Sequence, residues 1–135
     1  MISRRTALST FAGATLIVSN LPAFGKSSRS SAVQFLDTDN DGTVDLMEAK
    51  KAASALFDKL DRDHDGTLDK RELAGRLSAK ELSAADPDHD GTLTKDEYLA
   101  IVEQRFNAAN LDSDGTLDAK ELSTKAGQNL MRLLK

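Results

Sequence analysis

The sequence predicts a compact all-α domain in which four copies of one acidic loop are joined by helices. The first observation is a 12-residue motif whose copies start at Asp37, Asp61, Asp86 and Asn110. The second is the nearly even spacing of these starts, which makes each gap between loops about as long as a loop itself. The third is the spacing of apolar residues, which fall four and one positions before each loop, at the helical i, i+3 interval. Each gap therefore holds about one helix, shared by the loops on either side.

Each loop contains the residue types that surround a hard cation with oxygen. Oxygen-bearing side chains occupy positions 1, 3, 5, 9 and 12, position 7 offers its backbone carbonyl, and Gly at position 6 permits a sharp turn. This pattern is that of an EF-hand loop, and it occurs four times in the chain. The predicted metal ligands are Asp37, Asp39, Asp41, Thr43, Asp45 and Glu48; Asp61, Asp63, Asp65, Thr67, Asp69 and Glu72; Asp86, Asp88, Asp90, Thr92, Thr94 and Glu97; and Asn110, Asp112, Asp114, Thr116, Asp118 and Glu121.

The acidic residues of the chain are concentrated at these ligand positions, which hold 18 of the 22. Acid that only aids solubility has no reason to cluster in this way, so the pattern indicates cation binding. Loops one and two have five carboxylates each, and loops three and four have four each. We expect the fourth site to be the weakest, because the neutral Asn110 opens that loop. The alternative is that Asn110 is a tolerated ligand with little effect on affinity.

The three connections between loops differ in continuity. Residues 46–60 and 95–109 contain neither Gly nor Pro, so each is predicted to form one unbroken helix. The middle connection contains Gly75 and then a capping box at Ser78–Glu81, which predicts two short helices with a bend between them. A straight helix of this length keeps its two loops about 20 Å apart, whereas a bend lets them meet. The loops are therefore predicted to pair two with three, through Leu68 and Leu93, and one with four, through Val44 and Leu117.

The segment 1–25 is predicted to be an export signal, followed by a flexible leader at 26–32 and the metal-binding domain at 33–135. Arg4 and Arg5 precede an apolar stretch, and Ala23–Gly25 fits a cleavage site of small residues. The arginine pair resembles a twin-arginine signal, with an ordinary secretory signal as the alternative. Periplasmic localisation is therefore expected. The apolar stretch is short for a membrane helix, so we expect no stable membrane association.

Removing the signal takes away two arginines and no acid, so the formal net charge changes from −4 to −6. This charge argues against a nucleic-acid partner. The sequence contains no cysteine, and it has no nucleophile–base pair or phosphate-binding loop, so we do not expect an enzyme. With few aromatic residues to stabilise helices that are marginal alone, folding is expected to depend on bound metal. Monomer and metal-dependent dimer both remain open.

The close and even spacing of the loops, four loops in one domain, Asn at the start of loop four alone and the export signal together resemble the lanmodulin family. The resemblance covers 33–134 and includes Phe57–Asp61, Lys95–Leu99 and Lys125–Gly127. It implies a periplasmic protein that binds lanthanide(III) ions of the La, Ce or Nd type at up to four sites, with Ca²⁺ as a weaker ligand. It also implies a role in lanthanide uptake, buffering or delivery, with a lanthanide-dependent alcohol dehydrogenase or an uptake system as partner. A periplasmic calcium-binding or buffer protein is the alternative.

Overall fold

The computed structural model describes residues 30–135. The predicted export signal at 1–25 and the first part of the leader therefore lie outside the described residues. Within the described part, helix α1 (Ser31–Leu36) begins the domain. It includes Ser31 and Ala32, which the sequence pattern placed in the leader. None of the helices in the described part is both long and apolar enough to span a bilayer.

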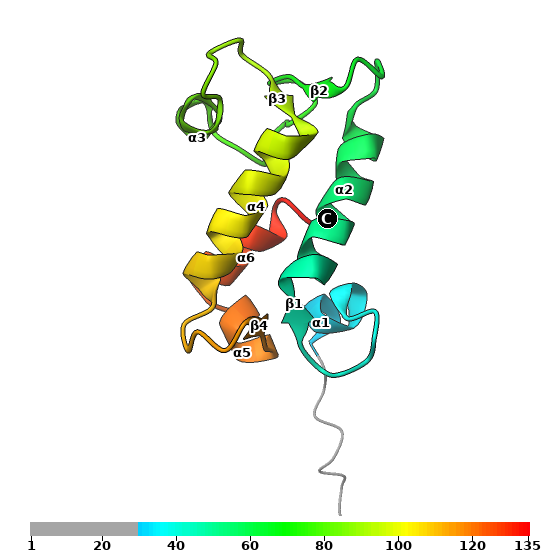
Figure 1. Cartoon of the computed structure of the whole chain (residues 1–135), viewed down its shortest axis with the longest axis vertical. Coiled ribbons are helices and arrows are strands. Elements are labelled where there is room, and N and C mark those ends of the chain that lie inside the picture. The colour runs from blue at the N-terminus through cyan, green and yellow to red at the C-terminus, as the bar shows by residue number, and fades with distance from the viewer. Residues whose placement is uncertain (1–29) are drawn as a thin grey trace, which may run out of the picture.

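Two long helices form the frame of the domain and lie side by side (Figure 1). They are α2 (Leu46–Leu60) and α4 (Lys95–Ala109), with 15 residues each. Short antiparallel strands lie at both ends of this frame: β1 (Val44–Asp45) pairs with β4 (Thr116–Leu117), and β2 (Thr67–Leu68) pairs with β3 (Leu93–Thr94). The predicted pairing of loop one with four and loop two with three is confirmed. At 1.5 Å per residue, the long helices separate the two loop pairs by roughly 20 Å.

The loops themselves form the ends of both long helices. At the start of α2, the Asp45 carboxylate accepts a hydrogen bond from the Glu48 N–H, and the Glu48 carboxylate accepts one from the Asp45 N–H. This capping box satisfies two N–H groups that a helix end leaves unpaired. The helix ends at Asp61, the first residue of loop two. Because α4 has the same kind of start and ends at Asn110, the predicted sharing of one helix by successive loops is confirmed for the first and third connections.

The middle connection contains one α-helix where two were predicted. This helix, α3 (Ala79–Ala85), begins at the predicted capping box. Residues 69–77 form turns, in which the Arg76 N–H donates to the Leu73 carbonyl at 2.8 Å and Gly75 has a φ of +79°. The prediction of a first short helix was wrong: the chain makes a single turn, in which the Leu73 N–H donates to the Asp69 carbonyl, and leaves helical geometry at Gly75. The left-handed backbone at Gly75 provides the predicted bend.

Helix α5 (Ala119–Leu122) contains the last residues of loop four, and α6 (Lys125–Met131) follows it. The break between them lies at Thr124, whose hydroxyl caps α6 by accepting from the Gly127 N–H at 3.1 Å. Helix α6 packs on α4, and Arg105 of α4 donates to the Asn129 carbonyl at 2.6 Å. The last helix therefore reinforces the frame formed by the two long helices.

The hydrophobic core of the domain contains buried residues from both the loops and the long helices. The residues at position 8 of the loops form the strand pairs and are completely buried: Val44, Leu68, Leu93 and Leu117. Between the long helices, the rings of Phe57 and Tyr98 meet edge to face, with centroids 5.7 Å apart. Tyr98 is fully buried, as predicted for a core residue, and its hydroxyl donates to the Leu133 carbonyl at 2.8 Å. This bond ties the C-terminal residues to α4.

Candidate metal centres

Three loops bring three carboxylates each into a cluster that could hold one cation. In each cluster, ligand atoms from positions 1, 3 and 12 all lie within 4.8 Å of one another. The clusters are Asp37, Asp39 and Glu48; Asp61, Asp63 and Glu72; and Asp86, Asp88 and Glu97. Carboxylate oxygens are the ligands that hard cations prefer, so the donor set fits a hard metal ion. The first and last positions of a loop meet because the loop folds back on itself.

The backbone of each loop makes this return possible. Asn40 has a φ of 63° and Gly42 a φ of 90°, so the chain passes through two left-handed residues in loop one. Gly adopts this conformation without steric cost, which is why position 6 is Gly in every loop. Each loop also has a left-handed residue at position 4: Asn40, His64, His89 and Ser113.

Hydrogen bonds from the loop hold the carboxylate at position 1. In loop one, Asp37 accepts from the Gly42 N–H at 2.8 Å and from the Asp41 N–H at 3.1 Å. The same two bonds hold the first residues of loops two and three. Asp37, Asp61 and Asp86 are buried, so these donors compensate for part of the lost hydration.

The carboxylate at position 12 is held from both ends of the loop. Glu48 accepts from the N–H of Thr38 at 2.6 Å and from that of Asp45 at 3.1 Å. Loops two and four repeat this arrangement. In loop three the bond from position 2 is absent, because Pro87 has no N–H to donate to Glu97. Thus one carboxylate closes the loop and also begins the next helix.

Positions 5 and 9 lie differently from the clustered carboxylates. At position 5, Asp41 accepts from both the N–H and the hydroxyl of Thr43 at 2.8 Å, and all four loops repeat this pair. At position 9, the side chains cap the backbone N–H of position 12: Asp45, Asp69, Thr94 and Asp118. The structure therefore brings positions 1, 3 and 12 together and binds the side chains of positions 5 and 9 to the backbone nearby.

The carboxylates at positions 1 and 3 of a loop have pKa values shifted in opposite directions. Partial burial disfavours the charge on Asp37, but hydrogen bonds from Gly42 and its neighbours outweigh this effect and lower its pKa. Asp39 accepts a hydrogen bond from Asp41, yet burial and repulsion by Asp41 and Glu48 prevail and raise its pKa. The pKa of Asp63 is raised in the same way. The pKa of Asp88 is raised chiefly by its hydrogen bond with Asp86 and then by burial, and the pKa of Asp86 is lowered. Position 3 therefore carries unrelieved repulsion that a cation would remove.

Loop four has no cluster of three carboxylates among the described residues, because Asn110 replaces the first one. The Oδ1 atom of Asn110 is buried and has no hydrogen-bond partner in the described structure. A buried oxygen without a partner is costly, and a cation in the loop would provide one. Loop four thus keeps an oxygen ligand at position 1 while lacking its charge.

Comparison with known families agrees with this geometry. A family model described as EF hand matches residues 34–51, 54–74 and 79–102, which contain loops one, two and three. These are EF-hand repeats. No match was found among curated proteins. Loop four lies beyond the matched residues, but it pairs with loop one and has the same closing bonds to Glu121.

The sequence pattern missed one contact in the first EF-hand loop. Thr38, at position 2, donates its hydroxyl to Glu48 at 3.0 Å, in addition to its N–H. The other loops have Arg62, Pro87 and Leu111 at this position. The sign of this contact in the sequence was the hydroxyl of Thr38, since loop one alone has a hydroxyl-bearing residue at position 2. With this additional bond, Glu48 accepts more hydrogen bonds than any other residue at position 12.

Proposed function

We propose that this protein is an exported, high-affinity lanthanide-binding protein that folds when metal binds. The observation that carries the proposal is the concentration of carboxylates: 18 of the 22 acidic residues occupy ligand positions of the four loops. The three carboxylate clusters support metal binding as such. The preference for a lanthanide rests on charge and on the resemblance to lanmodulins.

The charge argument concerns the net charge that remains after binding. Five carboxylates around a divalent ion leave a charge of about −3, whereas a trivalent ion leaves about −2. Raising the ion's charge from two to three increases each ion–carboxylate attraction by about half. The cost of removing water from the ion also rises. Burial and repulsion by neighbouring carboxylates raise the pKa of Asp39 and Asp63, and an ion of higher charge relieves more of that repulsion.

Calcium is the second candidate, because EF-hand loops with oxygen ligands bind it and three loops match that family. Thr94 in loop three and Asn110 in loop four reduce the carboxylate count toward what a calcium loop needs. On either reading the protein binds hard cations at two separate loop pairs. The cellular role that we propose for the lanthanide reading is uptake, buffering or delivery in the periplasm, with a lanthanide-dependent alcohol dehydrogenase or an uptake system as the partner.

Circular dichroism distinguishes the two metals and tests the coupling to folding. The chain from residue 26 onward would be stripped of metal and titrated with La³⁺ or Ca²⁺ at buffered free concentrations. We expect the helical signal to rise with both ions, with the La³⁺ midpoint far below the Ca²⁺ midpoint. Equal midpoints would favour the calcium protein. A metal-free form that is already fully helical and melts cooperatively would contradict metal-coupled folding.

A further inference from the structure

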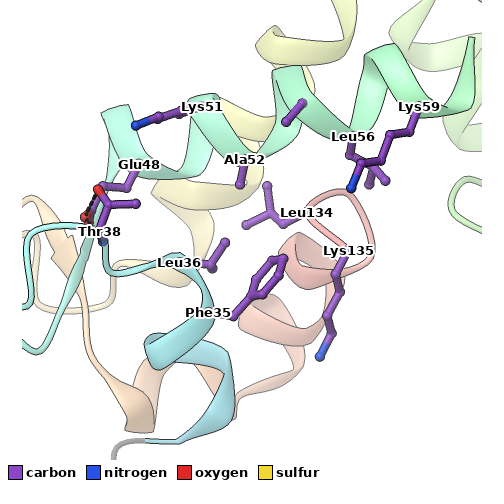
Figure 2. Close-up of a pocket in the computed structure, with 11 residues that line it drawn as sticks. Phe35, Leu36, Thr38, Glu48, Lys51, Ala52, Leu56, Lys59, Leu134 and Lys135 are labelled. Atoms are coloured by element: carbon purple, nitrogen blue, oxygen red, sulfur yellow. Dashed lines mark hydrogen bonds between the residues drawn. The ribbon is translucent and has the colours of Figure 1, made fainter.

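A pocket lies outside the metal loops, where helices α1 and α2 meet the C-terminal residues. Its volume is about 370 Å³. Its apolar lining comes from three parts of the chain: Phe35 and Leu36, Ala52, Ala55 and Leu56, and Leu134. In Figure 2 the labelled members of this group converge on one space, with Phe35 and Leu134 facing each other across it. Pockets of this size and character hold small molecules in other proteins.

The wall of this pocket includes an aromatic side chain that the fold leaves open to solvent. Phe35 is 61% exposed, although the neighbouring Leu36 is buried and reaches the core. A folded domain gains nothing from exposing a phenyl ring, whereas a bound apolar molecule would cover it.

Three lysines and one acidic side chain, Glu48, line this pocket in a protein that is acidic as a whole. The lysines are Lys51, Lys59 and Lys135. None of the three forms an ion pair within the described residues, whereas Lys50 and Lys95 pair with acids on other helices. Lys59 and Lys135 lie at the side of the pocket away from Glu48 (Figure 2). An apolar space with unpaired ammonium groups at its edge matches a ligand that has an apolar body and an anionic head.

We propose that this pocket binds a small amphiphilic anion, with its chain or ring against Phe35 and Leu134 and its anionic head beside Lys59 and Lys135. Once the predicted export signal is removed, the residues left before the described part of the chain do not suit the site. Lys26–Arg29 bring positive charge and no large apolar side chain, so they would meet the lysines unfavourably.

The pocket also shares a wall with the first EF-hand loop. Thr38 and Glu48 line its other end, where the Thr38 N–H and hydroxyl donate to the Glu48 carboxylate. Because Glu48 is a predicted metal ligand, metal that orders loop one also orders this wall. We therefore expect metal at loop one to strengthen binding of the anion, and linkage then requires the anion to strengthen metal binding by the same factor. This coupling rests on the proposed metal function; the anion site itself does not.

The test uses decane-1-sulfonate as the anionic probe, because a sulfonate competes poorly for the bound metal, and decan-1-ol as its neutral analogue. The protein would be saturated with metal, in parallel with La³⁺ and with Ca²⁺, and the titration followed by amide NMR. We expect shifts confined to Phe35, Ala52, Leu56 and Leu134, with the sulfonate bound more tightly than the alcohol. Each of Lys59→Gln and Lys135→Gln should weaken sulfonate binding about two- to fivefold without affecting the alcohol.

The control is Lys80→Gln, which removes an exposed lysine outside the pocket and should leave sulfonate binding unchanged. Ala55→Phe adds a ring at an exposed position of the wall and should block both probes while leaving the metal loops intact. Equal binding of sulfonate and alcohol would overturn the proposal, and so would the absence of shifts in the pocket. Self-association through Phe35, seen as a rise in mass without any probe, would also overturn it. Because the titrations are run with La³⁺ and with Ca²⁺, they still test the anion site if the protein shows no preference for lanthanides.

Discussion

The packing of Gly127 connects a substitution in helix α6 to the metal ligand of loop four. A Cβ atom built on Gly127 would lie 2.3 Å from the carbonyl oxygen of Glu121 and 2.5 Å from the Cα of Leu122. Both are backbone atoms, so no side-chain rotation relieves the clash. Gly127→Ala must therefore move α5 away from α6 by about 1 Å to restore ordinary contact. Glu121 is position 12 of loop four and would move with α5.

Two effects follow from this movement. Overpacking of a core position costs about 1–3 kcal/mol. The better helix propensity of Ala returns about 1 kcal/mol, which leaves a net loss of up to about 2 kcal/mol. Ligand distances to a hard ion span only about 2.3–2.6 Å, so a 1 Å displacement of Glu121 should weaken the fourth metal site by tenfold or more.

Chemical denaturation of the metal-saturated protein measures the first effect, and the Gly115 amide resonance in a metal titration measures the second. The Gly66 resonance in loop two should be unaffected, because loop two lies at the other end of the long helices. Lys125→Ala, at an exposed position of the same helix, is the matched control and should change neither quantity. Unchanged stability together with unchanged filling of loop four in Gly127→Ala would refute the reasoning.

Three further predictions concern other parts of the domain. Asn110→Asp adds the missing charge to loop four and should raise its metal affinity, as measured by site-resolved NMR; an unchanged or lower affinity would mean that Asn is an equivalent ligand. Leu68→Ala removes a fully buried bridging residue, so it should destabilise the metal-bound protein by about 2–5 kcal/mol in denaturation experiments and uncouple loop two from loop three; independent filling in the parent protein would contradict the pairing account. Burial raises the pKa of Tyr98, the only tyrosine, to about 12, so its stabilisation should be lost as the pH rises from about 10 through 12. Absorbance of the tyrosinate should follow this midpoint in the folded protein, and a midpoint near 10 with the fold intact would show that the ring is not buried.

The pairing of the loops was predictable because one local signal decided it. Gly75 and the capping box after it interrupt the middle connection, whereas the outer connections have no interruption. Each outer connection is therefore one long straight helix. The loops at the two ends of such a helix cannot meet, so the pairing follows from geometry. The mistaken short helix before Gly75 has a related cause. The sequence there is compatible with helix, but its stability depends on length and on packing that a local pattern does not contain.

The roles of individual ligands were less accessible than their positions. The spacing identifies position 12 as a ligand, but it does not reveal that Glu48 also accepts two hydrogen bonds that close the loop. The anchoring of the C-terminal residues by Tyr98 was likewise hidden, since the two groups are 35 residues apart in the sequence. Contacts of this kind depend on how the helices come together, which a repeat pattern does not specify.

The most direct test of lanthanide binding is a replacement experiment with the four loop glycines as reporters. The amides of Gly42, Gly66 and Gly91 donate to the first carboxylate of their loops, so each reports the state of its own site, and Gly115 reports loop four. The protein would be saturated with millimolar Ca²⁺ and then titrated with La³⁺. Our account predicts that La³⁺ displaces Ca²⁺ stoichiometrically, with the shift of Gly115 last to complete. Retention of the calcium spectrum in the presence of equimolar La³⁺ per site would contradict it.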